Sequence, residues 1–322
     1  MKIPLLLCIG CVAVSFAADT PPSKPIPAIT PGKVIIPLEK MRRIWGELVS
    51  LDPGTRTGTF RKEDTDELMP FTVMPYAELL HHATRGDLED FKIGERAIFR
   101  LHVNEKEEWV WLTYIQDEMN MLNGHKEYFH VDALDAATGK LTCKWASADL
   151  SFVRKPEVVI ETDPETRYWR GGQPVKFSDI RVGDKLRTKT HGRGAGEHRV
   201  AWEVFLDDES LLHFQSQQKT VHADRIKTQG APGYVDEADG RTLRLTLFNE
   251  ADEYLTPLKQ GAVVQVAAAG TDRKPVMQSV RAKVLETGRR KGERQTFVVL
   301  ELDEPQSAFA PAKLARLWIN AP

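Results

Sequence analysis

One phrase occurs at least twice in this chain, and internal repetition constrains the fold more than any other feature of a sequence. Each copy opens with a strand, a tight turn and a second strand, and closes with Asp-x-x-Ile/Val-Gly-Asp/Glu-Lys/Arg. The copies run, in order, from Gly46–Phe60 to Asp90–Val103, from Phe129–Cys143 to Asp179–Thr190 and, in degraded form, from Gly233–Leu247 to Leu258–Ala268. The repetition predicts three similar small units in a row.

Hydrophobic periodicity identifies these units as β-structure. Apolar and polar residues alternate in Ala97–Val103 and in Trp109–Thr113, which is typical of strands with one buried face. Turn residues such as Asp52-Pro53-Gly54 separate the alternating runs. The chain therefore reads as a succession of short strands.

Helix signals are few and short. We predict one helix over Tyr76–Ala83 and another over Asp117–Leu122, the second closed by Gly124 as a left-handed cap. Three strands, a short helix and two more strands are the element order of an OB-type barrel. Gly94 and Gly183, in the closing phrase of the repeat, fit a tight bend before the fourth strand. The acidic residue after each glycine is expected to hold that turn.

The predicted fold class is therefore all-β, with three tandem small OB-like β-barrels and short helical insertions. The predicted barrels span residues 42–124, 125–224 and 225–322, and each range suits a barrel of five or six strands.

Three short motifs in the first unit support the same fold. Gly46–Asp52 fits Gly-x-Val-x-x-x-Asp with Leu48 in place of the Val, and Phe71–Val73 fits Phe-x-Val. Phe91–Glu95 fits Leu-x-x-Gly-Asp with Phe and Glu at the ends. In this order the motifs resemble those of the OB-like barrels of bacterial exported proteins. The resemblance implies that they open the barrel, form its third strand and precede its fourth strand.

The segment Met69–Val73 also resembles part of the periplasmic copper and silver chaperones with OB folds. In that family a His, a Trp and a Met-x-Met pair hold a soft metal on one face of the barrel. This resemblance implies a barrel with a soft-metal site. The chain departs from the pattern because Glu67 stands at the first Met position and no Trp stands just before it.

The first residues predict an export signal over residues 1–18. Lys2 is followed by the uncharged run Ile3–Val14 and by the small-residue end Ser15–Ala18. One positive charge, an apolar run too short to span a bilayer and a small-x-small end are typical of a cleaved secretory signal. A lipoprotein attached at Cys11 is the alternative. We expect an exported protein, periplasmic or extracellular, whose folded part follows a Pro-rich linker over residues 19–41.

Loss of the signal would leave Cys143 as the only cysteine, so no disulfide within the chain would stabilise it. Of the 44 basic residues Lys2 would be lost while all 46 acidic residues remain, which gives a net charge of about −3. A chain of this charge is not expected to have nucleic acid or an anionic membrane as its main partner. No later apolar stretch reaches membrane length, so we do not expect a membrane-spanning protein.

Met119, Met121 and His125, with His130 nearby, form the strongest candidate metal site. Thioethers and imidazole together suit Cu(I) outside the cytoplasm. The alternative is that the methionines pack over the end of a barrel.

His81, His82 and Cys143 are less promising candidates. Adjacent residues of a helix point about 100° apart, so we interpret His81 and His82 as a solvated helix end. Cys143 lies in a strand without a base beside it, and we interpret it as buried apolar filler.

Tyr168, Trp169 and Arg170 are the candidate ligand-binding residues, because an exposed group of this kind stacks on sugar rings or bases. Packing over a barrel end is the alternative. The basic stretches Lys185–Arg199 and Arg289–Arg294 read either as loops that grip an acidic polymer at a barrel rim or as solvated loops.

The sequence contains no GxSxG, HExxH, P-loop, Rossmann or paired-cysteine motif, and we predict neither an enzyme nor a cofactor. We predict an exported, non-catalytic binding or adaptor protein that uses barrel faces or grooves between barrels to bind an unknown envelope or extracellular ligand. A periplasmic copper-binding protein is the alternative. A hydrolase with a site between barrels is a third possibility.

Overall fold

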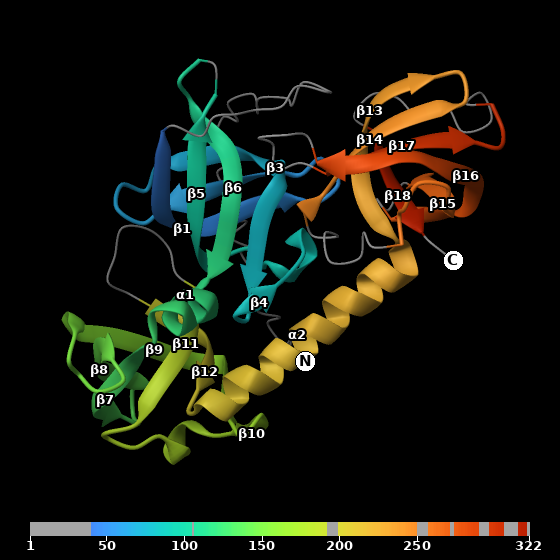
Figure 1. Ribbon diagram of the computed structural model, residues 1–322. Helices are drawn as coiled ribbons and strands as arrows, with labels where there is room; N and C mark the ends of the chain where they lie inside the picture. The colour runs from blue at the N-terminus through green and yellow to red at the C-terminus, as the bar shows by residue number, and fades with distance from the viewer. Residues whose placement is uncertain are drawn as a thin grey trace, which may run out of the picture.

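Three β-barrels follow one another along the chain (Figure 1). The computed structural model describes residues 40–320 except 105, 192–198, 250–256, 271–273, 290–295 and 306–314. The predicted signal and all but the end of the predicted Pro-rich linker lie outside the described residues.

Five strands form the first barrel. They are β1 (Met41–Asp52), β2 (Thr57–Lys62), β3 (Leu68–His81), β5 (Arg96–Val103) and β6 (Trp109–Asp117). Strand β1 pairs with β2 and β5, β2 with β3, and β5 with β6, all antiparallel, while β3 and β6 run parallel. This circuit is that of the OB fold. The rings of Phe60 and Phe99 stack at 4.1 Å in the core.

The second barrel repeats the first, element by element. Its strands are β7 (Glu127–Asp135), β8 (Lys140–Ser147), β9 (Val153–Arg170), β11 (Lys185–His191) and β12 (Arg199–Phe205). Strands β9 and β12 form the parallel pair, and the circuit closes between β11 and β7. In both barrels the third strand continues into a small hairpin and then a 3-10 helix: β4 (Thr84–Arg85) and η1 (Leu88–Asp90), then β10 (Gln173–Val175) and η2 (Phe177–Asp179).

The closing phrase of the repeat has one structural role in both barrels. Asp90 and Asp179 each accept a hydrogen bond at 2.8 Å from the backbone N–H three residues earlier, which holds η1 or η2. Gly94 and Gly183 have φ of 88° and 93°, a conformation that favours glycine. The acidic residue that follows each glycine likewise accepts from the backbone N–H three residues earlier, as the sequence predicted.

The third barrel is closed by six strands, all of them antiparallel. They are β13 (Ala231–Asp239), β14 (Thr242–Leu247), β15 (Val263–Ala269), β16 (Pro275–Arg289), β17 (Thr296–Leu302) and β18 (Arg316–Asn320), in the circuit β13-β14-β17-β16-β15-β18. The degraded closing phrase keeps only its glycine turn, at Gly261 (φ 85°), and leads into β15. The predicted all-β class of three tandem barrels is confirmed, and the third barrel differs from the first two in strand order.

The two α-helices join the barrels. Helix α1 (Glu118–His125) connects the first barrel to the second, and Asp117 caps it by accepting from Asn120 N. Its left-handed C-cap is Lys126, so the prediction that Gly124 forms this cap was wrong. Helix α2 (Asp208–Gln229) runs from the second barrel to the third (Figure 1). The predicted boundary at 224/225 falls inside α2.

The predicted helix over Tyr76–Ala83 was wrong, because this segment continues β3 alongside β6. The strand ends at His81, and a two-residue loop of His82 and Ala83 leads into β4. Both loop residues have positive φ, 47° and 61°, which matches the twist of a tight hairpin.

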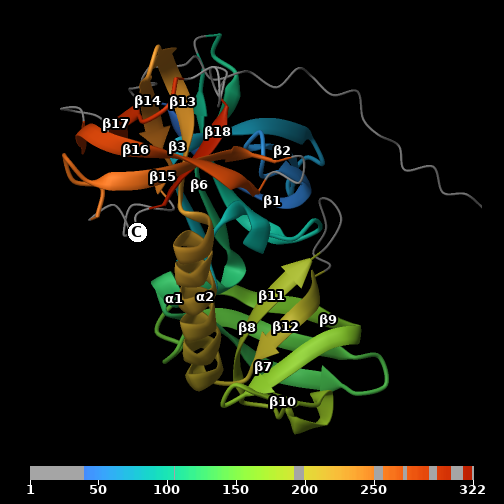
Figure 2. The ribbon, with the colours of Figure 1, turned by 90° about the vertical axis from the view of Figure 1, so that its right-hand side faces the viewer.

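Polar contacts fix the barrels and α2 against one another, and Figure 2 shows α2 running from the second barrel at the bottom to the third barrel at the top. Arg225 pairs with Asp87 and Asp90 beside η1, and His222 Nδ1 lies 3.0 Å from Asp87. Glu95 and His191 form an isolated β-bridge between the first two barrels. The third barrel contacts the first through Arg316, which donates to Pro53 O at 2.8 Å, among other bonds.

Candidate functional site

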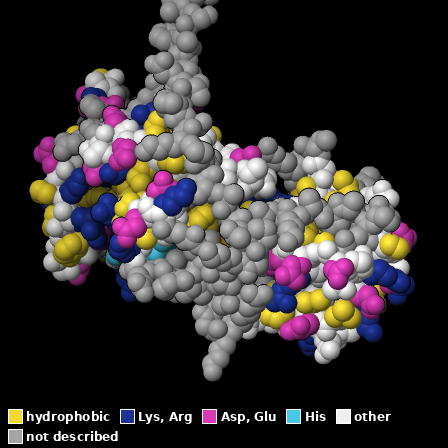
Figure 3. Space-filling view, turned by 90° about the horizontal axis from the view of Figure 1, so that it is seen from above, with side chains coloured by type: hydrophobic (Ala, Val, Ile, Leu, Met, Phe, Trp, Pro, Cys, Tyr) yellow, Lys and Arg dark blue, Asp and Glu magenta, His cyan; other side chains and the backbone are white. Residues whose placement is uncertain are grey.

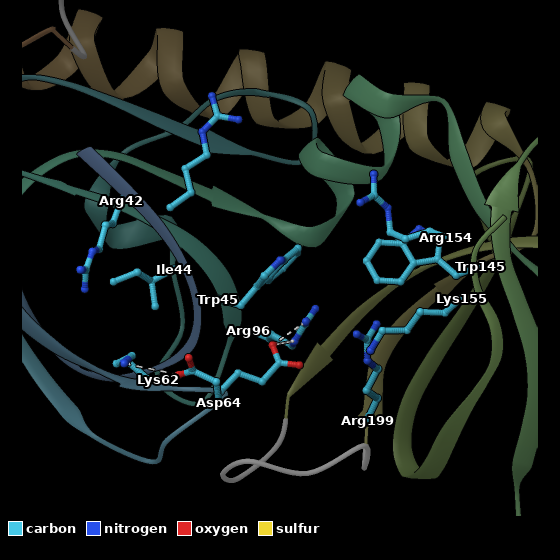
Figure 4. Close-up of a pocket in the computed structure, with 12 residues that line it drawn as sticks. Arg42, Ile44, Trp45, Lys62, Asp64, Arg96, Trp145, Arg154, Lys155 and Arg199 are labelled. Carbon is cyan, nitrogen blue, oxygen red and sulfur yellow. Dashed lines mark hydrogen bonds and ion pairs between the residues drawn. The ribbon is translucent and has the colours of Figure 1, made fainter. Parts of the chain in front are cut away.

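A cleft of about 840 Å³ lies between the first and second barrels (Figure 4). Seven basic side chains, two tryptophans, two acidic side chains and one isoleucine line it: Arg42, Arg43, Ile44, Trp45, Lys62, Glu63, Asp64, Arg96, Trp145, Arg154, Lys155 and Arg199. The first barrel contributes β1, β2 with the turn that follows it, and β5. The second barrel contributes β8, β9 and β12.

Trp45 and Arg96 form the wall on the side of the first barrel. The Arg96 guanidinium lies 3.9 Å over the Trp45 ring, a cation–π contact. Arg96 also pairs with Glu63, with Nη2 to Oε2 at 2.6 Å, and with buried Glu118. One face of the half-buried Trp45 ring is therefore covered and fixed by Arg96.

Trp145 and Arg154 form the wall on the side of the second barrel. Trp145 is 4% exposed, and its Nε1 donates to Glu127 Oε2 at 2.7 Å. Arg154 makes a forked pair with the same carboxylate, which raises the pKa of its guanidinium. Trp145 and Arg154 are thus already engaged within the protein.

Arg199, at the start of β12, differs from Arg96, the other buried basic residue of the cleft. It is 5% exposed, and its Nη1 atom has no hydrogen-bond partner among the described residues. The Glu118 carboxylate lies 3.7 Å from this atom, but its oxygens already accept from Arg96 and from the N–H and hydroxyl of Thr190. Burial and the neighbouring Arg96 charge lower the pKa of Arg199. The cleft therefore contains a buried cation that is ion-paired with Glu118 but whose Nη1 makes no hydrogen bond within the described residues.

Exposed cations surround the cleft. Arg43 and Lys155 are exposed, and Arg42 lies over the Trp109 ring at 4.5 Å. Lys62 is paired at 3.5 Å with Asp64 and with Glu67. On the face seen in Figure 3, basic and acidic side chains are interspersed, whereas basic side chains outnumber acidic ones in the lining of the cleft. Such an excess attracts anions.

The structure does not bring the three predicted metal ligands together. Met119 is fully buried beside Phe205 and Leu211, whereas Met121 belongs to the core of the second barrel. His125 is exposed. Both methionines pack in apolar clusters, which was the alternative interpretation.

The structure also separates the predicted ligand-binding residues. Tyr168 packs against the core of the second barrel, edge to face with Phe177, while Trp169 packs edge to face on Phe214 of α2. Arg170 is exposed, and its Nη2 donates to Asp179 O at 3.2 Å. Consecutive residues of a strand point to opposite faces, so Trp169 lies on the opposite face from Tyr168 and Arg170, and the three side chains form no common surface.

His81 and His82 do not form a solvated helix end, and that interpretation was wrong. His81 is 5% exposed at the end of β3, and ligand atoms of His81, His82 and Asp117 lie within 4.8 Å of one another. This spacing would suit a metal ion. However, the Lys189 ammonium lies 2.7 Å from His81 Nε2 and 3.7 Å from Asp117 Oδ2, so a protein cation already occupies this position.

Cys143 is fully buried in the core of the second barrel, as predicted. Burial, with a smaller contribution from Asp132, raises the pKa of its thiol to about 12. Of the two predicted basic loops, residues 192–198 and 290–295 lie outside the described residues. The described part of the first of these stretches supplies Lys189 and Arg199, both of them buried.

Sequence reasoning missed the cleft because its lining residues come from six strands and a turn. A local signal did exist, since Arg42, Arg43 and Trp45 lie within four residues and Arg154 is next to Lys155. The sequence alone does not show that the first half of β1 faces β8 and β9 of the second barrel across one cleft.

Comparisons with known proteins add little to this description. No family model matches the chain, and no curated protein matches it in sequence. A solved structure described as drosophila Unr CSD456 is similar at 13% sequence identity, over 82% of this chain and 98% of that chain, with a TM-score of 0.19. At that score the likeness carries no argument, and the strand pairings above define the fold. Neither α-helix in the described part of the chain has the length and apolarity needed to span a bilayer.

Proposed function

We propose that this protein is a non-catalytic binding protein and that the cleft between its first two barrels binds an anionic ligand. The observation that carries the proposal is the buried guanidinium of Arg199, a residue that lines the cleft and whose Nη1 donor has no hydrogen-bond partner among the described residues. A buried donor left unpaired is costly, and an anionic acceptor would remove that cost.

The rest of the cleft supports the same proposal. Arg43 and Lys155 are exposed at its edge and would add long-range attraction for an anion. Arg96 and Arg154 are ion-paired with carboxylates of their own barrels, so the walls of the cleft are fixed before a ligand binds. A pre-formed site of this kind binds with little loss of conformational entropy.

The proposal extends to location. The signal-like residues 1–18 motivate an exported protein that meets its ligand in the envelope or outside the cell. Cell fractionation, with N-terminal sequencing of the mature protein, tests this part separately. An uncleaved N-terminus in the cytoplasmic fraction would contradict it.

The binding test uses the full mature chain and heparin, a generic polyanion, measured by calorimetry at low and at moderate salt. We expect the double variant Arg43→Glu/Lys155→Glu to bind at least about tenfold more weakly, because it reverses two charges at the edge of the cleft. The matched control, Arg181→Glu/Lys219→Glu, reverses two exposed charges elsewhere and should bind like the wild type. Equal affinities for all three proteins, or no binding by the wild type, would refute the cleft as the site.

A further inference from the structure

We infer that the ligand of the cleft is an acidic glycan, a chain of sugar rings that carries carboxylate groups, and that one carboxylate binds at Arg199. This inference rests on the proposed function and specifies its ligand class. Three features of the cleft favour it over other polyanions.

The first feature is the single free anion position. Arg154 already holds the Glu127 carboxylate in a forked pair, and Arg96 donates two hydrogen bonds, at 2.9 and 2.6 Å, to one oxygen of Glu63. Both pairs show that the arginines of the walls bind carboxylates, a group whose two oxygens match the planar guanidinium fork. Arg199 is buried in the same cleft, but its Nη1 donates to no carboxylate in the described part of the chain. One further carboxylate would complete the set.

The second feature is the number of ring surfaces. Trp145 is only 4% exposed, and Arg96 covers one face of the Trp45 ring. Among the lining residues, Trp45 alone therefore retains a partly exposed aromatic surface, and Figure 4 shows it beside Arg96 on the side of the first barrel. Proteins that bind single-stranded nucleic acid stack successive bases on several aromatic rings. A single platform suits one sugar ring packed by its apolar face.

The third feature is the pair of carboxylates in the lining. Asp64 is 72% exposed at its side chain and Glu63 is 29% exposed, and both lie beside the cations. These oxygens can accept hydrogen bonds from sugar hydroxyls. They would repel a backbone that carries a phosphate at every residue and offers few donors. A glycan with hydroxyls between its spaced carboxylates fits both the cations and the acids.

The experiment compares four probes on the full mature protein by calorimetry at one salt concentration. The probes are an oligogalacturonate, its methyl ester, inorganic polyphosphate and oligothymidylate. We expect the oligogalacturonate to bind, and the uncharged ester to bind at least about tenfold more weakly, because the ester lacks the charge that Arg199 requires. Arg199→Gln should weaken oligogalacturonate binding by about tenfold or more, whereas Arg181→Gln should leave it unchanged.

Arg199 is buried, so its replacement tests the fold as well as the site. Arg199→Lys therefore serves as a second variant, since it keeps the charge but lacks the fork, and thermal unfolding of each variant reports whether it is folded. A folded Arg199→Lys protein that binds oligogalacturonate like the wild type would overturn the role of Arg199.

The remaining outcomes separate this inference from the proposed function. Binding of polyphosphate or oligothymidylate that depends on Arg43 and Lys155, without oligogalacturonate binding, would overturn the glycan and keep the cleft. Oligogalacturonate binding that survives methyl esterification would overturn the carboxylate. If none of the probes nor heparin binds, both the inference and the proposed function fail.

Discussion

Lys189 Nζ lies 2.7 Å from His81 Nε2, so a buried ammonium of the second barrel contacts an imidazole of the first. The same ammonium lies 2.8 Å from Glu95 Oε1, and both Lys189 and Glu95 are almost completely buried. Because an ammonium can only donate, Nε2 of His81 accepts, and its Nδ1–H donates to Gln218 Oε1 at 3.0 Å. This chain of bonds links the first barrel, the second barrel and α2.

The charges around Lys189 explain why a lysine can be buried here. Burial lowers the pKa of Lys189, but Glu95, Asp117 and Glu203 outweigh burial and raise it. Burial also raises the pKa of Glu203, yet the hydrogen bond from His82 and the charges nearby lower it to about 2. The interface therefore depends on paired charges, and the removal of one partner leaves the others uncompensated.

We predict that Lys189→Met lowers the free energy of unfolding by about 3–5 kcal/mol, because it leaves buried carboxylates without their cation. Urea unfolding followed by circular dichroism measures the change. Lys219→Met, at an exposed position of α2, is the control and should change stability by less than about 0.5 kcal/mol. A Lys189→Met protein as stable as this control would show that the ion pairs do not hold the interface.

A second prediction concerns pH. Burial, together with the charges of Lys189 and His82, lowers the pKa of His81 well below 6.5. Between pH 6.5 and that lowered pKa, the unfolded chain binds a proton that the folded protein does not. The free energy of unfolding should therefore fall as the pH drops below 6.5, by up to about 1.4 kcal/mol per pH unit from this group.

The variant His81→Gln should lack this contribution, because glutamine does not titrate. The stability difference between wild type and variant should be constant above pH 6.5 and should change steadily below it. Burial raises the pKa of Glu95 from 4.5 and gives a dependence of opposite sign, but both proteins share it. A difference that stays constant down to pH 5 would contradict the lowered pKa of His81.

The first two barrels could be predicted from the sequence because their repeated phrase has a local cause. Asp90 and Glu95 each accept a hydrogen bond from a backbone N–H three residues earlier, and Gly94 adopts a positive φ. Asp179, Asp184 and Gly183 do the same in the second barrel. Turn chemistry of this kind is readable without knowledge of the packing. Because these turn residues recur along the chain, the sequence also predicted that the barrels lie in tandem.

Helix α2 could not be predicted in the same way, because its buried stripe is partly polar. Gln218 and His222 are buried at helical spacing from Leu211 and Ile226, and they contact the carboxylates at the end of η1 and just before it. Apolar periodicity is the main signal for a helix in a sequence, and here tertiary partners replace it. The contacts of His81 could not be predicted either, because its partners lie 108 and 137 residues away in the sequence.

A third prediction concerns Glu118, the buried carboxylate behind the cleft. Glu118→Gln should lower the free energy of unfolding by about 3–5 kcal/mol, because Arg96 and Arg199 would lose their shared anion. The same variant should bind heparin more tightly than the wild type, since a ligand anion would then stand in for Glu118. Glu157→Gln, at an exposed position of β9, is the control for both measurements. Weaker heparin binding by a folded Glu118→Gln protein would contradict this account of the cleft.

A fourth prediction separates two glycines. A Cβ at Gly46 would lie 2.4 Å from the backbone oxygen of Arg61 and 2.6 Å from the Phe60 ring, whereas a Cβ at Gly124 would meet nothing within 4 Å. Gly46→Ala should therefore destabilise the protein by about 1–3 kcal/mol, because β2 must move away from β1. Gly124→Ala, inside α1, should stabilise it by about 0.5–1 kcal/mol. Thermal and urea unfolding measure both, and a neutral Gly46→Ala would mean that β1 and β2 do not approach as closely as described.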